Sequence, residues 1–203
     1  MDKMPEPGGA KFSYKYYHWG PFLFHVKITP KECQMILREG KKTRKKPYDF
    51  RHDLAGHLSE EYKFTEPKNF AWFQKYLEAY ANGYNDMWRK GKGHTISAFR
   101  IDSLWINYMK AGDFNPPHNH SGDISFVIYP DMPKELIEEN KNYKGTAQGP
   151  AGIAWLYGEE IQNQYINTVA HLPETGDLFI FPASLTHWVY PFRSNTERVS
   201  MSG

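Results

Sequence analysis

Cysteine is nearly absent from the sequence, because Cys33 is the only one among 203 residues. One cysteine can form neither an intramolecular disulfide nor a zinc cluster held by several thiolates. Any metal site in the chain must therefore use histidine and carboxylate ligands.

The sequence also lacks an excess of charge and a long apolar run. Its 25 Lys and Arg against 23 Asp and Glu give a net charge of +2, which gives no reason to expect nucleic acid or an anionic membrane as a partner. No stretch approaches the roughly eighteen uninterrupted apolar residues of a membrane span, and residues 1–5 lack the apolar core of a secretory signal. We therefore expect a soluble, cytoplasmic protein.

Aromatic residues are abundant, at 16% of the chain, and their spacing divides it into two parts. We expect residues 1–203 to form one domain, with residues 1–92 as a mostly helical bracing segment and residues 93–203 as the β-rich core. The aromatic residues of segment 14–26 favour an extended opening, and Pro30 begins a short helix. The clearest helix spans residues 68–90, where an apolar stripe recurs at steps of three and four residues: Phe70, Phe73, Leu77, Tyr80, Tyr84 and Trp88.

After Gly93 the apolar pattern changes to a period of two, which is typical of strands. The predicted strands lie near residues 96–99, 104–109, 124–129, 153–157, 178–181, 188–190 and 198–201. Helices followed by many short strands predict an α+β fold whose β part is a sandwich or barrel, with the N-terminal helices bracing one outer face. The long connection 134–150 is a candidate lid.

Two histidines stand together in Pro117-His118-Asn119-His120. Residues two apart on extended chain point the same way, so His118 and His120 can aim at one metal ion. Imidazole suits iron, zinc, copper or nickel, and two histidines with one carboxylate form a common open iron site. The remaining histidines show no ligand spacing, and we expect surface or core roles for them: His18, His25, His52, His57, His94 and His171.

The C-terminal segment adds a third histidine, His187, and an arginine inside an apolar run, Arg198. An arginine in a β run is rarely buried unless it meets an anion, because an unpaired buried charge is costly. Its guanidinium can hold a carboxylate in a two-point fork, and Ser200 faces the same way and can add a hydroxyl donor.

In order and spacing these residues resemble the Fe(II)/2-oxoglutarate-dependent oxygenases. The resemblance implies a double-stranded β-helix, that is, a jelly-roll or cupin-like barrel, which the N-terminal helices would brace. The resemblance covers about residues 95–203. It rests on an aromatic strand, a glycine turn, Pro-His-x-His, a distal Gly-Asp-strand-Phe-Pro segment before a histidine, and Arg-x-Ser. In this chain the matching segments are 105–108, Gly112, 117–120, 176–182, His187 and 198–200.

The resemblance implies Fe(II) bound by His118 and His187, with the distal carboxylate of 2-oxoglutarate held by Arg198 and Ser200. It implies that Asn107 or Tyr108 contacts the iron-chelating end of this cosubstrate. The implied reaction uses O2 to couple decarboxylation of 2-oxoglutarate to oxidation, usually hydroxylation, of a primary substrate, which can be a small molecule or a peptidyl side chain.

The third iron ligand is where the sequence departs from the family, which usually has Asp or Glu at the position of His120. His120 itself can complete a three-histidine site. Alternatively, Asp123 supplies the carboxylate, or the position stays open to water or an anion.

Two other function classes remain open. A cupin-like barrel can bind a metal without using 2-oxoglutarate, although cupin sites usually add a glutamate soon after the His-x-His pair and have no use for Arg198. The chain can also be an interaction module whose iron site has decayed, which metal content would reveal.

Overall fold

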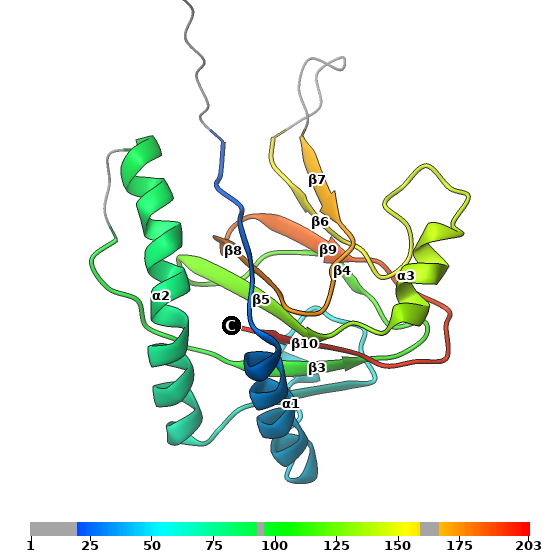
Figure 1. The fold of residues 1–203 in the computed structure, drawn as a ribbon, viewed down its shortest axis with the longest axis horizontal. Coiled ribbons are helices and arrows are strands. Elements are labelled where there is room, and N and C mark those ends of the chain that lie inside the picture. Colours follow the sequence, from blue (N-terminus) through cyan, green and yellow to red (C-terminus); the bar gives the residue numbers. More distant parts are fainter. Residues whose placement is uncertain (1–19, 93–95, 159–166) are drawn as a thin grey trace, which may run out of the picture.

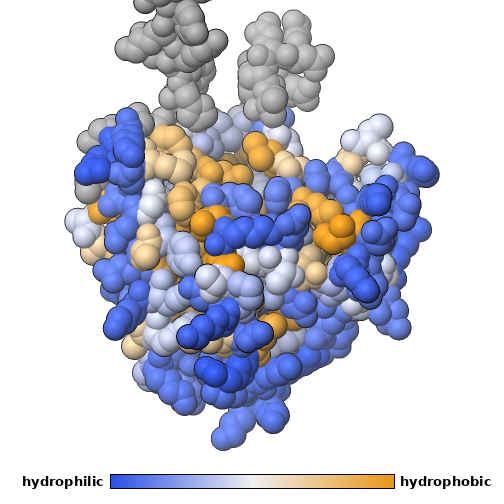
Figure 2. Space-filling view, viewed as in Figure 1, coloured by the Kyte–Doolittle hydropathy of each residue, from blue (hydrophilic) through white to orange (hydrophobic). Residues whose placement is uncertain are grey.

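The computed structural model describes residues 20–92, 96–158 and 167–203. The aromatic residues before position 20 that contribute to the predicted extended opening lie outside the described residues. Among the described residues, no helix combines the length and apolar character needed to cross a membrane. On the face seen in Figure 2, hydrophobic residues occur as small separate patches among hydrophilic ones.

The described strands form two antiparallel sheets (Figure 1). The large sheet has the order β1-β8-β5-β10-β3-β2 and the small sheet the order β4-β9-β6-β7. The strands of the large sheet are β1 (Phe24–Lys27), β2 (Glu60–Lys63), β3 (Trp105–Met109), β5 (Ile124–Asp131), β8 (Asp177–Pro182) and β10 (Arg198–Ser202). Those of the small sheet are β4 (Asn115–His118), β6 (Ile153–Leu156), β7 (Thr168–His171) and β9 (Thr186–Val189). This is the predicted α+β, double-stranded β-helix fold.

Alternation along each strand of the large sheet separates two cores. On β8, Leu178 and Ile180 belong to the core on the helix side, whereas Phe179 and Phe181 belong to the core between the two sheets. Successive strand residues point to opposite faces, so one strand serves both cores. The sheet is therefore buried on both sides, and any polar residue on its inner face lies inside the molecule.

Helices cover the outer face of the large sheet. The main ones are α1 (Pro30–Lys45) and α2 (Pro67–Lys92), which Figure 1 shows on the same side of the sheet. The predicted helix 68–90 is confirmed as α2, and its apolar stripe packs into the core on the helix side. A short 3-10 turn, η1 (Arg51–Asp53), and helix α3 (Lys134–Lys141) complete the described helices.

Helix α1 begins at a capping box. The Glu32 side chain accepts a hydrogen bond from the Thr29 backbone at 2.5 Å, and the Thr29 hydroxyl accepts one from the Glu32 backbone at 3.4 Å. Pro30 occupies the first turn, where a missing N–H costs nothing. The local sequence therefore fixes the point at which the chain leaves β1 and turns over the sheet.

Thr29→Ala is expected to lower the free energy of unfolding by about 1 kcal/mol, because it removes the acceptor that caps the first turn of α1. Urea unfolding of the wild type and the variant measures this difference. Thr29→Ser is the matched control, since it keeps the hydroxyl, and it should lose much less. Equal stability of the Ala variant and the wild type would show that the capping hydrogen bond contributes nothing.

The N-terminal segment does more than brace the barrel. It supplies β1 and β2, which form the two edges of the large sheet, although only helices and one extended opening are predicted there. The predicted strand at residues 96–99 is wrong. The side chain of Asn85 pairs with both backbone groups of Ile96, and Gln74 bonds Phe99 O and Ile101 N. Amide side chains of α2 thus satisfy this backbone in place of a neighbouring strand.

The candidate lid at residues 134–150 is a packed segment. Its first half is α3, with Leu136 fully buried. The Asn140 amide donates to Gln148 O and Pro150 O at 3.0 and 2.8 Å. Glu139 accepts hydrogen bonds from the backbone N–H groups of Arg193 and Ser194. These contacts hold the segment against the connection between β9 and β10, and they give no support for a lid.

Candidate metal centre

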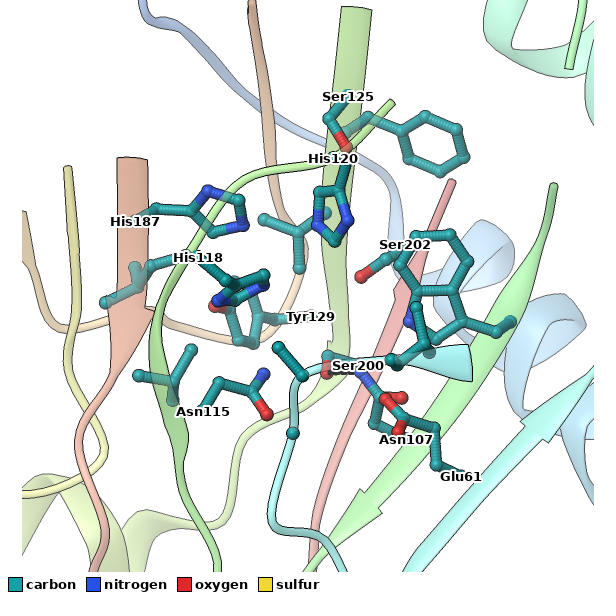
Figure 3. A pocket seen from close by; sticks show the side chains of 18 of the residues that line it. Glu61, Asn107, Asn115, His118, His120, Ser125, Tyr129, His187, Ser200 and Ser202 are labelled. Atoms are coloured by element: carbon teal, nitrogen blue, oxygen red, sulfur yellow. Dashed lines mark hydrogen bonds between the residues drawn. The ribbon is translucent and has the colours of Figure 1, made fainter. Parts of the chain in front are cut away.

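Three histidines from two parts of the chain converge at one end of the small sheet. His118 ends β4 and stands directly opposite His187 on β9 in the sheet register. His120 follows two residues after His118, and its backbone N–H bonds Ala183 O at 2.9 Å. One potential ligand atom from each of the three side chains lies within 4.8 Å of the others. Figure 3 shows the three rings facing one another on one side of a pocket.

Two of the imidazoles are already oriented for a metal. Nδ1 of His118 lies 2.7 Å from Pro116 O, and Nδ1 of His187 lies 2.9 Å from Leu185 O. A ring that donates Nδ1–H to a carbonyl presents the lone pair of Nε2, the arrangement of many histidine metal ligands. The backbone two residues earlier therefore sets the tautomer of each ring.

The three rings are also held in the neutral form. Burial lowers the pKa of His118, lowers that of His120 to about 4 and lowers that of His187 to about 3. Proximity of the rings to one another adds to the effect for His120 and His187. Neutral imidazole is the form that binds a metal, so the site fits a divalent cation.

Asp123, the alternative third ligand, is not in this group. It is exposed, and among the described residues the group of potential ligands consists of the three histidines without it. Asp123 lines a wider neighbouring groove instead. Of the alternatives left open by the sequence, the geometry favours His120.

Arg198 lies on the inner face of β10 and lines the same pocket as the histidines. It is 2% exposed, and its Nη1 donates to Ala151 O at 3.1 Å. Its Nε has no hydrogen-bond partner among the described residues. Burial lowers the pKa of the guanidinium. A buried cation without an anion is costly, which indicates that the pocket is built to receive a carboxylate.

The register of the large sheet determines which of the other predicted residues face the pocket. Ser200 faces the pocket two residues after Arg198 and stands opposite Asn107 on β3. The Asn107 amide donates to the Ser200 hydroxyl at 3.4 Å, and Asn107 Oδ1 has no partner within the described ranges. Tyr108, the other candidate, is on the opposite face of β3, where Arg44 lies 4.2 Å from its ring centre. Alternation on the strand therefore places Asn107, not Tyr108, toward the pocket.

One residue of the pocket, Glu61, is not predicted from the sequence. Glu61 on β2 is 2% exposed and lines the pocket opposite the histidines, as Figure 3 shows. Burial, with a smaller effect from Asp49, raises the pKa of Glu61 to about 8. Its Oε2 has no hydrogen-bond partner in the described part of the chain. No signal in the sequence distinguishes Glu61 from the neighbouring Glu60, which is paired with Arg44 at 2.7 Å on the outer face.

The pocket is open to the outside at a mouth. At this mouth it meets a wider groove, with which it shares Trp105, His120 and Ser125. The groove is bordered by α2, by residues 96–103 and by residues 119–126. A molecule lying in the groove can therefore approach the histidines from outside while another fills the pocket.

Two histidines that show no ligand spacing in the sequence, His25 and His171, form a second cluster with Asp177. His25 on β1 and His171 on β7 lie 2.8 and 3.3 Å from the two oxygens of buried Asp177. Burial alone would raise the pKa of Asp177, but hydrogen bonds from the Glu174 N–H and from His25 lower it. Lys27 also lies 3.3 Å from this carboxylate. The cluster joins an edge strand of each sheet, and hydrogen bonding accounts for it.

Comparison with known proteins shows which family and fold the chain resembles. Residues 103–203 match a family model described as "Putative 2OG-Fe(II) oxygenase". No curated protein sequence is significantly similar to the chain.

Solved structures of the same fold include a prolyl-4-hydroxylase from Pseudomonas putida, with a TM-score of 0.55, 14% identity and 89% of each chain covered. A prolyl hydroxylase from Trichoplax adhaerens, in complex with a peptide fragment of the hypoxia inducible factor oxygen degradation domain, has a TM-score of 0.55 at 12% identity. That match covers 89% of this chain and 81% of the other. OsALKBH1 has a TM-score of 0.57 at 12% identity, covering 93% of this chain and 99% of the other. At these identities the likeness shows the fold.

Proposed function

Because residues 103–203 belong to the 2OG-Fe(II) oxygenases, we propose that the protein is an Fe(II)- and 2-oxoglutarate-dependent hydroxylase with a three-histidine iron site. The observation that carries the proposal is the fully buried Arg198, unpaired with any carboxylate among the described residues, in the same pocket as His118, His120 and His187.

The donor set fits the implied metal. Three neutral imidazoles converge within ligand distance of one another, and imidazole is a common ligand of iron. His118, His120 and His187 would hold Fe(II), which supplies the activation of O2 for oxidising an unreactive C–H bond. Without a carboxylate ligand the site keeps the full charge of the cation, which favours an anionic cosubstrate.

The pocket fits a dicarboxylate beside the metal. Arg198 and Ser200 would hold the distal carboxylate of 2-oxoglutarate, through the guanidinium fork and the hydroxyl. Asn107 stands opposite Ser200 and would contact the cosubstrate nearer its 2-oxo end. Tyr129, Phe181 and Ile153 pack around this pocket, and apolar surroundings of this kind strengthen each of these electrostatic contacts.

The primary substrate is placed in the groove outside the pocket. Trp105 and His120 line both spaces, so a substrate side chain or small molecule resting there reaches the metal centre. The peptide bound by the Trichoplax adhaerens prolyl hydroxylase is one example of an oxygenase substrate of this kind, and a peptidyl side chain is our preferred candidate.

Anaerobic loading with Fe(II), followed by titration with 2-oxoglutarate, tests the proposal. We expect the weak visible charge-transfer band of an iron-chelated 2-oxo acid, saturating at one equivalent of 2-oxoglutarate per iron. Succinate does not chelate through a 2-oxo group, so it is the matched control ligand and should give no band. Stoichiometric iron binding without a band would overturn the proposal and favour a cupin-like metal protein. Absence of iron binding would favour an interaction module.

A further inference from the structure

Glu61 is a buried acidic group for which the proposed chemistry has so far given no role. It stands opposite Asn107 on β3, and Asn107 stands opposite Ser200 on β10. Glu61, Asn107 and Ser200 therefore form one row across three neighbouring strands, and all three line the pocket. The row begins at the edge strand β2 and runs toward the strand that carries Arg198.

Glu61 forms no ion pair within the described ranges, and its Oε2 has no hydrogen-bond partner there. Arg51, whose charge acts on Glu61, is held by Asp49 through a hydrogen bond of 2.6 Å. Asn107 stands opposite Glu61, and the pocket lining also includes the apolar Leu54 and Ala55 and the neutral amide of Asn115. An ionised carboxylate in such surroundings is costly, whereas a carboxylic acid is neutral and offers one O–H donor.

The bound cosubstrate would lie close to Glu61 in this pocket. The two negative charges of 2-oxoglutarate would be offset by the iron ion, held by histidines on the opposite side of the pocket from Glu61, and by Arg198, the only permanently charged side-chain cation among the residues that line it. The other titratable side chains lining the pocket are Tyr129 and the three histidines, which are uncharged near neutral pH. An ionised Glu61 would repel the carboxylates of 2-oxoglutarate, whereas the acid form offers them a hydrogen-bond donor.

We propose that Glu61 is a positioning residue for 2-oxoglutarate: it donates a hydrogen bond to the cosubstrate as a neutral carboxylic acid and repels it when ionised. This inference rests on the proposed function. The affinity for 2-oxoglutarate then depends on pH through the ionisation of Glu61. This residue lies on β2, outside the part of the chain that matches the family.

The direction in which 2-oxoglutarate affinity changes with pH follows from the raised pKa of Glu61. Burial, then repulsion from Asp49, raises the pKa of Glu61 to about 8, and Arg51 opposes them. With that value about nine-tenths of the protein has a protonated Glu61 at pH 7 and about one-tenth at pH 9. The affinity of the iron-loaded protein for 2-oxoglutarate should therefore fall by up to about tenfold between pH 7 and pH 9.

The test measures 2-oxoglutarate affinity anaerobically, from the charge-transfer band of the iron-loaded protein, between pH 6.5 and pH 9. Glu61→Gln keeps the shape and a donor but cannot ionise, so it should bind at pH 7 within about threefold of the wild type and lose the decline. Glu60→Gln is the matched control, because Glu60 lies on the outer face of the same strand and should keep the decline.

A second measurement does not depend on the cosubstrate. The folded protein retains a proton on Glu61 that the unfolded chain releases near pH 4.5, so the stability of the wild type should fall as the pH rises from about 4.5 to 8. Glu61→Gln should remove this part of the pH dependence, and Glu60→Gln should not.

The outcomes separate the two proposals. A wild type that binds 2-oxoglutarate at pH 7 but shows the same affinity at pH 9, or a Glu61→Gln protein that retains the decline, would overturn the role of Glu61 and leave the oxygenase proposal standing. A wild type that gives no band at pH 7 would overturn the oxygenase proposal itself. In that case the stability measurement still reports whether Glu61 holds its proton.

Discussion

Arg198→Met is expected to abolish detectable 2-oxoglutarate binding and at the same time to raise the thermal stability of the ligand-free protein. The two effects have one cause. Arg198 is 2% exposed and its Nε is without a partner among the described residues. In the ligand-free protein only the bond to Ala151 O and the Tyr129 ring, 5.3 Å from the guanidinium, offset the cost of burying its charge.

The sizes of the two effects follow from the contacts that the ligand-bound and the ligand-free protein each lose. Truncating one partner of a buried charge pair costs about 2–5 kcal/mol of binding, so affinity for 2-oxoglutarate should fall by about 30-fold to 5,000-fold. The ligand-free protein loses the bond to Ala151 O but no longer buries a cation, a net gain of about 1–3 kcal/mol. For a chain of this size that corresponds to a melting temperature about 5 °C higher.

Calorimetric titration and thermal unfolding measure the two effects on the same samples. Arg198→Lys is the matched control, since it keeps a charge but loses the planar fork, and it should bind weakly without the gain in stability. Iron content should be unchanged in both variants, because Arg198 is not a ligand. A Met variant that is less stable than the wild type and still binds 2-oxoglutarate would contradict the assignment.

His118→Ala and His187→Ala are each expected to eliminate stoichiometric Fe(II) binding. Loss of a partner that merely orients a ligand weakens metal binding about 10- to 100-fold, and loss of the ligand itself should weaken it further. Anaerobic iron titration with metal analysis measures the effect, and circular dichroism checks that the fold persists.

The comparison of His120→Ala with Asp123→Asn decides the third ligand. We expect His120→Ala to lose iron and Asp123→Asn to keep it, because His120 lies within the cluster and Asp123 is exposed outside it. His120→Asp is informative in addition, since a carboxylate there restores a two-histidine, one-carboxylate site. Loss of iron by Asp123→Asn, with iron retained by His120→Ala, would contradict the three-histidine site.

The core of the site was predictable from the sequence because its residues sit in short local patterns. His118 and His120 share one extended segment, and Arg198 interrupts an apolar run, so residue type and spacing make them candidates for a metal site and an anion site. The resemblance to the oxygenase family then implies their individual roles and the double-stranded β-helix, and the structure shows this fold.

Glu61 was not predictable, for a physical reason. Strand β2 reads Glu-Glu-Tyr-Lys, with no alternation of apolar and polar residues, so it resembles a solvated loop. Only tertiary packing distinguishes Glu60, paired with Arg44 and Lys110, from its buried neighbour. The same limit explains residues 96–99, whose apolar pattern resembles a strand but whose backbone is satisfied by side chains of α2.

The position of β1 and β2 has a consequence for how this family should be divided and recombined. The homologous region begins at residue 103, but both edges of the large sheet come from residues before it. A fragment beginning there would expose the edges of β8 and β3, together with the bare hydrophobic face that α1 and α2 cover. Exposed edges of this kind template pairing between chains. A fragment that contains only the homologous region is therefore expected to aggregate. Exchanging N-terminal halves between relatives would replace the strands and helices that prevent this aggregation, together with the residue at the position of Glu61.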